Sequence, residues 1–203
     1  MKFEHLGASP RIHPDAVIAP TAVISGDVAI GADCQVLHGA VITAEGGAIT
    51  LGENVIVMEN ALIRATSTNP VHIGDHVLVG PMASVSGATI GDEVFLATGS
   101  RVFNGARIGA RSEVRINAVV HLRTVLPEES VVPISWVAVG DPASILSPDK
   151  HDEIWEIQQD LDFPGYVFGL DRSTPDLMVQ LTERYARHLA RHADDRPVAP
   201  DAP

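Results

Sequence analysis

A period of six residues runs through most of the chain and constrains its fold more than any other feature. From His13 the chain divides into units such as HPDAVI, APTAVI, SGDVAI and GADCQV, and the period returns after each break until PEESVV ends at Val132. The position two residues before the end of each unit is small or β-branched, and the last position is aliphatic. These aliphatic residues are Ile18, Ile24, Ile30, Val36, Ile42, Val57, Ile63, Val79, Val85, Ile90, Leu96, Val102, Ile108, Val114, Val120, Leu126 and Val132.

A six-residue unit of this kind predicts one short strand followed by one tight turn. Three units make a triangular coil, and coils stacked at about the inter-strand spacing of ~4.8 Å place the aliphatic residues in a continuous interior column. An amphipathic helix would instead repeat its apolar positions every 3.6 residues. The sequence therefore predicts an all-β solenoid, a parallel β-helix of hexapeptide repeats.

Two interruptions break the period. The segment TAEGGAITL (43–51) has nine residues and RATSTNPVHI (64–73) has ten. We expect both to project from corners of the coil, where loops on a rigid scaffold often carry function. The alternative is that they cover a neighbouring subunit.

After the repeats the pattern changes to helical spacing. DKHDEIWEIQQDL, which follows Ser147 and Pro148, predicts a helix, and a second helix is expected from Ser173 through about His192, with FPGYVFGLDR as a loop between them. We expect at least one helix to pack along the side of the coil or across a subunit seam. The predicted divisions are a lead-in (1–12), the β-helix (13–146), a helical appendage (147–193) and a disordered tail (194–203).

Composition and charge limit the kinds of partner that the chain is expected to bind. The net charge of −12, with 14 dispersed Lys and Arg residues, argues against nucleic acid and anionic membranes as partners. No apolar run approaches the ~20 residues that span a bilayer, and the opening residues contain no apolar signal core. The single cysteine, Cys34, excludes an internal disulfide. A cytoplasmic location is expected.

The segment from about Pro14 to Ile145 resembles the γ-class carbonic anhydrases, including their thioesterase and ferripyochelin-binding-type relatives. The resemblance rests on SGDVAIG, GENVIVMENALI, IGDHVLVG, GATIGDEVFLATGSRVFNGARIG and PISWVAVGDPA, and on the placement of both insertions. It implies a left-handed coil and a homotrimer. Hexapeptide acyltransferases share the repeat and a similar G-x-P-A ending.

The resemblance also implies where a zinc ion would lie, at a seam between subunits, held by three histidines. The corresponding positions here are Arg64, Pro81 and Ser86. An arginine carries a fixed positive charge, a proline side chain has no donor atom, and a lone serine is a weak ligand. We therefore expect no metal and no cofactor at this position, and no ordinary zinc hydration of carbon dioxide.

Other family positions differ as well. Thr43-x-Glu45 stands where the family has an R-x-D pair, and Met58 stands in place of a glutamine beside the metal. The predicted seam pocket consists of Thr43, Glu45, Met58, Glu59 and Phe103.

Counting three units per coil places five residues on one corner stack: Thr43, Arg64, Ser86, Phe103 and His121. We expect Arg64 to pair with Glu45 and to put a cation at the former metal position. If its guanidinium stays unpaired, it suits a carboxylate or phosphate. The candidate catalytic residues are Arg64, Ser86, Glu45 and His121.

His38, His72 and His76 do not predict a rebuilt metal site. His72 and His76 are four residues apart, a spacing that shares a face on a helix but not on this coil, and His38 belongs to a lower coil. Ser86 as a nucleophile needs a base within hydrogen-bond reach, which only a neighbouring subunit would supply.

Three functions remain open. The first is a homotrimeric, metal-free relative of γ-carbonic anhydrase that binds a small anionic ligand or serves as an assembly protein. The second is a CoA-dependent acyltransferase, which needs a base histidine on a projecting loop. The third is an enzyme with altered chemistry that acts on an organic acid through Arg64 and Ser86.

Overall fold

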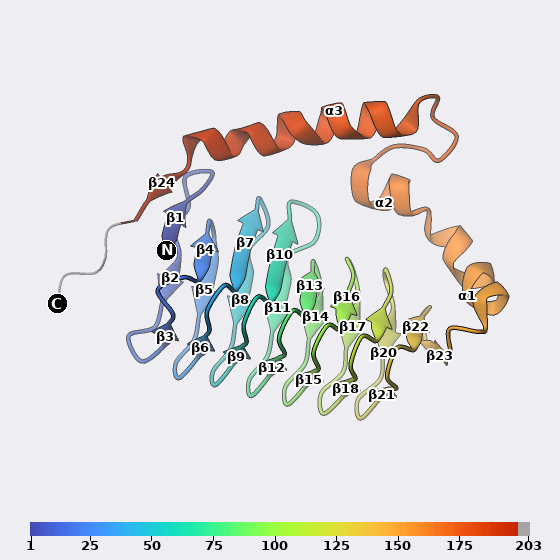
Figure 1. Ribbon diagram of the computed structural model, residues 1–203, viewed down its shortest axis with the longest axis horizontal. Coiled ribbons are helices and arrows are strands. Elements are labelled where there is room, and N and C mark those ends of the chain that lie inside the picture. The colour runs from blue at the N-terminus through green and yellow to red at the C-terminus, as the bar shows by residue number, and fades with distance from the viewer. Residues whose placement is uncertain (199–203) are drawn as a thin grey trace.

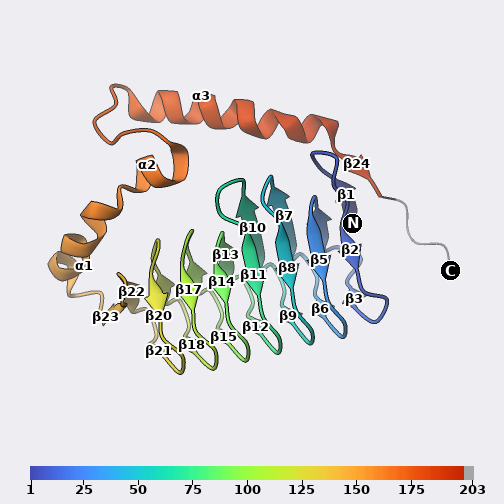
Figure 2. The same ribbon diagram turned by 180° about the vertical axis from the view of Figure 1, so that it is seen from behind.

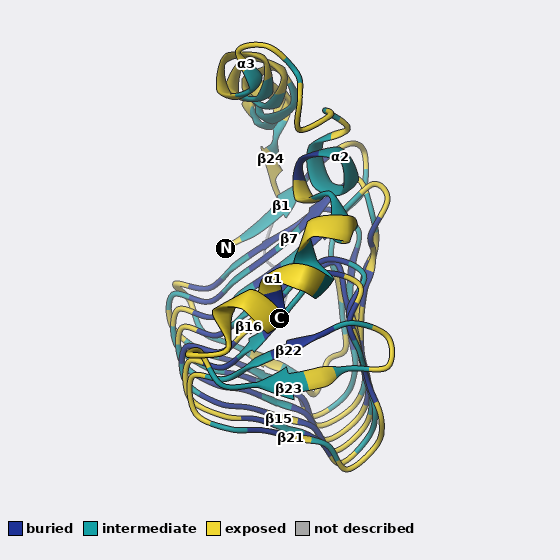
Figure 3. Ribbon diagram, turned by 90° about the vertical axis from the view of Figure 1, so that its right-hand side faces the viewer, coloured by how far each residue is buried: buried dark blue, intermediate teal, exposed yellow. Residues whose placement is uncertain are grey.

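The computed structural model describes residues 1–198 and shows a left-handed parallel β-helix of about eight turns (Figure 1). Strands three apart in sequence are hydrogen-bonded neighbours, so every third strand falls in the same flat sheet. The three sheets form the sides of a triangular prism, seen end-on in Figure 3. The predicted fold class is confirmed.

The first sheet is the largest and carries the features that matter for function. It consists of β1 (Lys2–Glu4), β4 (Val23–Ser25), β7 (Val41–Glu45), β10 (Leu62–Thr66), β13 (Ser84–Ser86), β16 (Arg101–Val102), β19 (Val119–Val120) and β22 (Val137–Val139), with β23 (Ser144–Leu146) and β24 (Arg196–Pro197) antiparallel at its two edges.

The other two sheets have seven strands each. The second contains β2 (Arg11–Ile12), β5 (Val28–Ile30), β8 (Ile49–Leu51), β11 (Val71–Ile73), β14 (Thr89–Ile90), β17 (Arg107–Ile108) and β20 (Val125–Leu126). The third contains β3 (Val17–Ile18), β6 (Gln35–Val36), β9 (Ile56–Val57), β12 (Leu78–Val79), β15 (Phe95–Leu96), β18 (Glu113–Val114) and β21 (Val131–Val132).

The six-residue pattern fills the interior directly. In the first sheet Ile24, Ile42, Ile63 and Val85 lie in register on successive coils, and each is fully buried. The small residues two positions earlier, such as Ala61, are buried as well. Because the core is one column of aliphatic side chains per sheet, few large rings are needed to fill it.

The two insertions extend strands as well as forming loops. β7 and β10 are the longest strands of the coil, and they pair in register from Val41 opposite Leu62 to Glu45 opposite Thr66. Only the middle of each insertion turns, at 46–48 and 67–70, with Thr66 bridging Asn69 across the second turn. The paired ends of β7 and β10 therefore extend beyond the neighbouring strands β4 and β13 of the sheet (Figure 1), and Glu45 is the last residue of β7.

The C-terminal segment contains α1 (His151–Gln158), the 3-10 turn η1 (Gln159–Leu161), α2 (Phe163–Phe168), α3 (Leu177–Leu189) and the 3-10 segment η2 (Ala190–Asp194). The two predicted helices are confirmed, whereas the prediction of a loop over FPGYVFGLDR is wrong in its first half. Pro164 lies in the first turn of α2, where a missing N–H costs no hydrogen bond, and Gly169 ends the helix with φ +65°.

The helices connect the two ends of the coil. α1 lies across the C-terminal end of the prism, where Ile154 is buried (Figure 3). α3 then runs back along the side of the coil, and both views show it returning toward the N-terminus (Figures 1 and 2). There β24 pairs antiparallel with β1.

The ends of the coil differ from the predicted divisions. The lead-in 1–12 forms β1 and β2, which belong to the first coil. Arg196 and Pro197, placed in the predicted disordered tail 194–203, form β24, while residues 199–203 lie outside the described part of the chain. Within residues 1–198, no helix is long and apolar enough to cross a membrane.

Replacing Ile90 by alanine tests the interior column. Ile90 is fully buried on β14, whereas its strand neighbour Thr89 is exposed. We expect I90A to lower the free energy of unfolding by about 2–5 kcal/mol through lost burial and a residual cavity. T89A, the matched control, should change it by less than about 0.5 kcal/mol. Urea unfolding measures both, and equal losses would contradict the assigned register.

Candidate functional site

The first sheet brings three of the predicted corner residues into register. Arg64 on β10 lies opposite Thr43 on β7 and opposite Ser86 on β13. Further along the coil, the Phe103 and His121 rings follow, with centroids 5.9 Å apart. The residues of this corner stack thus succeed one another along the coil, in the predicted order.

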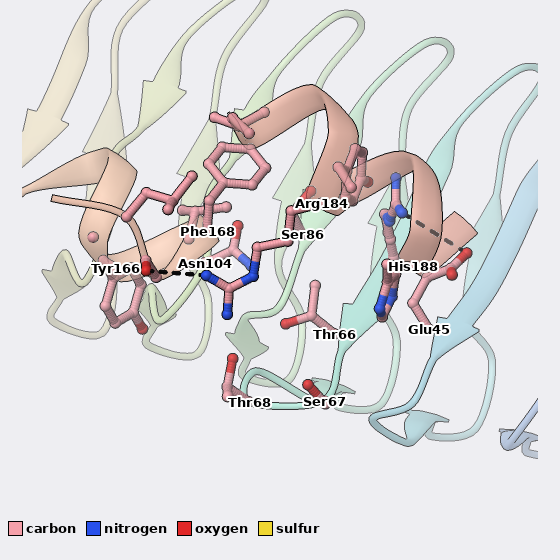
Figure 4. A pocket seen from close by; sticks show the side chains of 17 residues that line it. Glu45, Thr66, Ser67, Thr68, Ser86, Asn104, Tyr166, Phe168, Arg184 and His188 are labelled. Carbon is pink, nitrogen blue, oxygen red and sulfur yellow. Dashed lines mark hydrogen bonds and ion pairs between the residues drawn. The ribbon is translucent and has the colours of Figure 1, made fainter. Parts of the chain in front are cut away.

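A cavity of about 550 Å³ opens between this corner and the C-terminal helices (Figure 4). The coil contributes one wall and α2, α3 and the residues between them contribute the other. The lining residues are Glu45, Arg64, Thr66, Ser67, Thr68, Ser86, Asn104, Gly165, Tyr166, Val167, Phe168, Gly169, Leu170, Leu181, Arg184, Tyr185 and His188. We call this space the helix-corner cavity.

Two arginines give the helix-corner cavity its positive charge. The Arg64 guanidinium lies over the Tyr185 ring, 5.6 Å from its centroid, and its side chain is 27 % exposed. Figure 4 shows Arg184 reaching from α3 into the space between Asn104 and Thr66. Its Nη1 donates a hydrogen bond to the Gly169 carbonyl at 3.3 Å, which leaves other guanidinium N–H groups to face the cavity.

Glu45 is the acidic residue of this cavity, and its carboxylate is held from several sides. The side chain is 4 % exposed. Thr43 Oγ1 donates to Oε1 at 2.9 Å, and Nε2 of His192 lies 3.1 Å from both carboxylate oxygens. Arg64 Nη2 is farther, 3.9 Å from Oε1. The expected contact between Arg64 and Glu45 is therefore a long one, and the His192 ring is the closer partner of the carboxylate.

Aromatic and polar contacts hold the helices over the corner. The Tyr166 hydroxyl of α2 donates to Asn69 Oδ1 at 2.8 Å, and Asn69 is buried in the turn after β10. The Phe168 and Tyr185 rings meet edge to face, with centroids 5.8 Å apart, and so join α2 to α3. The helix wall of the cavity is thus attached to the coil through the second insertion.

His188 is the histidine that lines the cavity from α3. Burial first, and then the neighbouring Arg191 cation, lower the pKa of its imidazole. Nη2 of Arg191 lies 2.6 Å from Nδ1 of the ring. His188 is therefore a neutral imidazole near pH 7, suited to accept a hydrogen bond.

His121, a predicted catalytic candidate, does not line the helix-corner cavity. Burial lowers the pKa of its imidazole, and its Nδ1 atom is buried without a hydrogen-bond partner among the described residues. Phe103 packs against it and also lies outside the lining. Of the four catalytic candidates, the cavity collects Arg64, Ser86 and Glu45.

The remaining predicted positions lie at a different corner. Met58 and Glu59 lie between β9 and β10, and Pro81 lies between β12 and β13. They therefore precede the strands that carry Arg64 and Ser86, at the opposite corner of the first sheet. One chain does not bring these two corners together. Thr43 faces a second groove, of about 380 Å³, with Phe3, Val23 and Asp195.

The three residues at the positions that the resemblance assigns to zinc, Arg64, Pro81 and Ser86, do not suit that ion by their chemistry. The Arg64 side chain is occupied by the Tyr185 ring, and a guanidinium repels a cation. Pro81 has no donor atom, and Ser86 offers only a hydroxyl. No step of a zinc reaction is derived from these three positions.

Sequence reasoning missed the contribution of α3. Arg184 and His188 are four residues apart, which places them on one face of α3, and His192 follows four residues later in η2. That spacing was visible within the predicted second helix. What the sequence did not show is that this face returns to the corner formed by β7 and β10.

Comparisons with known proteins agree with the fold and the resemblance. No family model matches the chain. Gamma carbonic anhydrase 2, mitochondrial, of Arabidopsis thaliana is 29 % identical over 157 residues, covering 74 % of this chain and 54 % of the relative. The carbonic anhydrase of Geobacillus kaustophilus is 26 % identical over 159 residues, covering 78 % and 84 %. The chain spans about half the length of the Arabidopsis relatives it matches.

A solved structure supports the fold independently. A Bacillus cereus protein described as an acetyltransferase superposes on this chain with a TM-score of 0.53. The two are 18 % identical, and the superposition covers 92 % of this chain and 96 % of the other. At that identity the likeness concerns the coil and not its chemistry. The hexapeptide repeats and the curated relatives identify this chain as a member of a γ-carbonic anhydrase-like family of hexapeptide-repeat proteins.

Proposed function

We propose that this chain binds a small organic carboxylate in the helix-corner cavity and does not hydrate carbon dioxide through zinc at the family position. The observation that carries the proposal is the presence of two arginines, Arg64 and Arg184, in one cavity of about 550 Å³. A volume of this size lies within the range of small-molecule sites, about 300–1,000 Å³.

Charge balance favours an anion. Glu45 is the carboxylate within the lining, and it is already engaged by Thr43 and His192. The two guanidinium groups therefore retain donors for a ligand. Arginine presents pairs of parallel N–H groups that match the two oxygens of a carboxylate.

The rest of the lining favours an organic acid over a bare inorganic anion. Phe168, Leu170, Leu181 and the Tyr185 ring supply apolar surface on the helix side. Ser86, Asn104 and Thr66 supply hydroxyl and amide groups on the coil side. A ligand with a short carbon skeleton and at least one carboxylate complements both walls.

We further propose that the chain acts as a homotrimer. Arg64 and Ser86 lie at one corner of the prism, and Pro81 and Met58 at another, so a second copy is needed to bring these corners together at a seam. Light scattering should give a mass of about three times the 21.5 kDa chain. A mass of one chain across the concentration range would contradict the assembly.

Calorimetry with succinate and citrate as probes tests carboxylate binding. We expect saturable binding that R184Q weakens by about 10- to 100-fold, because a hydrogen bond to a charged group contributes about 1.5–3 kcal/mol and 1.4 kcal/mol is tenfold. R187Q is the matched control, since Arg187 lies on α3 outside the cavity lining and is exposed.

The outcomes separate the open functions. Equal affinities of R184Q, R187Q and the unsubstituted chain, or no binding of either probe, would contradict the carboxylate proposal. Saturable binding of acetyl-CoA with no binding of the two acids would favour the acyltransferase instead.

A hydration assay tests the second half of the proposal. With zinc supplied in excess, we expect carbon dioxide hydration at the uncatalysed rate, because Arg64, Pro81 and Ser86 offer no imidazole ligand. The Geobacillus kaustophilus relative serves as the positive control under the same conditions. Zinc-dependent hydration well above background that R64Q or S86A removes would overturn the assignment.

A further inference from the structure

A second cluster of polar groups lies beyond the helix-corner cavity, where the two ends of the chain meet. His5 follows β1, Glu45 ends β7, His192 lies in η2, and Asp195 immediately precedes β24. The antiparallel pairing of β24 with β1 brings Asp195 beside His5 although 190 residues separate them. His5 and Glu45 are buried, with 2 % and 3 % of their surface exposed.

The imidazole rings of His5 and His192 stack against each other. Their centroids are 4.3 Å apart, and their planes are inclined by 18°. Nδ1 of His5 lies 2.5 Å from Oδ1 of Asp195, and Nδ1 of His192 lies 2.8 Å from Oδ2 of the same carboxylate. One carboxylate is thus shared by the Nδ1 atoms of both rings.

The opposite ring nitrogens face a second carboxylate. Nε2 of His192 lies 3.1 Å from both oxygens of Glu45, and Nε2 of His5 lies 3.9 Å from Oε2. The His5 Nε2 atom is buried and has no hydrogen-bond partner among the described residues. A buried ring nitrogen without a partner is costly, so the contacts among the described residues leave the polar groups of this cluster incompletely satisfied.

A divalent cation on the Nδ1 side completes the cluster. With a metal on both Nδ1 atoms, each ring would keep its proton on Nε2, and His192 would donate that proton to Glu45. Nε2 of His5 would face the same carboxylate from 3.9 Å, beyond hydrogen-bond distance. A histidine ligand that donates its other N–H to a carboxylate is the usual outer arrangement of metal sites. The two charges of the cation also offset the two carboxylates.

We propose that His5, His192 and Asp195 bind a zinc ion or a similar divalent transition metal, with Glu45 as the positioning residue for the His192 ring. One ligand atom from each of the three residues lies within 4.8 Å of the others. Two imidazoles and one carboxylate suit zinc and its neighbours better than magnesium or calcium, which prefer oxygen ligands alone.

The site is accessible and separate from the zinc position of the family. His192 and Asp195 line the second groove, which opens beside Phe3 and Thr43, and their side chains are 34 % and 18 % exposed. The groove therefore provides an entry path and room for a solvent ligand at an open coordination position. None of Arg64, Pro81 and Ser86 takes part.

Zinc titration of the untagged full chain, after removal of bound metal with a chelator, tests the proposal. We expect calorimetry to show one ion per chain with micromolar or tighter affinity, and the thermal midpoint to rise with zinc. H192Q and D195A should each weaken binding at least tenfold, and E45Q should weaken it by about 10- to 100-fold as an outer-shell change. Cobalt provides a visible spectrum of the bound ion.

The matched control is H72Q, which removes an exposed histidine on β11 and should bind zinc like the unsubstituted chain. Circular dichroism establishes that each variant is folded, and D195A tests the site without changing either histidine. Absence of saturable binding, or unchanged zinc affinity and cobalt spectrum in H192Q and D195A, would overturn the proposal.

Discussion

The register between successive coils is the constraint on which the rest of the structure depends. Each strand of the coil from β1 to β22 pairs with the strand three positions away in the chain, so a six-residue unit must place its aliphatic residue directly over the one below. A shift by one residue would turn that side chain to the solvent face and bring a polar one inside. Because the column is continuous from Ile24 onward, corner positions are fixed as well, and the backbone register alone aligns Thr43, Arg64 and Ser86.

Glu45 shows how an insertion in the hexapeptide repeat creates a buried polar site. A regular hexapeptide would end β7 before Glu45, but the insertion continues the strand and buries the carboxylate where α3 returns. A buried carboxylate is tolerated only when charged or hydrogen-bonding groups surround it. Thr43 supplies a hydroxyl from the coil, and His192 supplies a ring nitrogen from the C-terminal segment. One side chain therefore borders both the arginine-lined cavity and the histidine cluster.

Sequence alone predicts the coil well because its information is local and repeated. The aliphatic period, both insertions and two of the helices follow from residues that are neighbours in the chain. The shared corner of Thr43, Arg64 and Ser86 follows from counting units. The return path of α3 does not, because it depends on contacts such as Tyr166 with Asn69, which are 97 residues apart. The contact between His5 and His192 is hidden from the sequence for the same reason, and Pro and Gly in the first turn of α2 predict a loop where the structure has a helix.

The path of α3 also changes how the coil should respond to local damage. In a solenoid each coil contacts only its neighbours, so coils at an end can detach while the middle persists. Here α1 lies against β22 at one end, and β24 pairs with β1 at the other. The C-terminal helices thus connect the first coil to the last. Unfolding of the coils at either end then requires loss of the helix contacts or of the β24–β1 pairing, so removal of β24 should destabilise the coils at both ends.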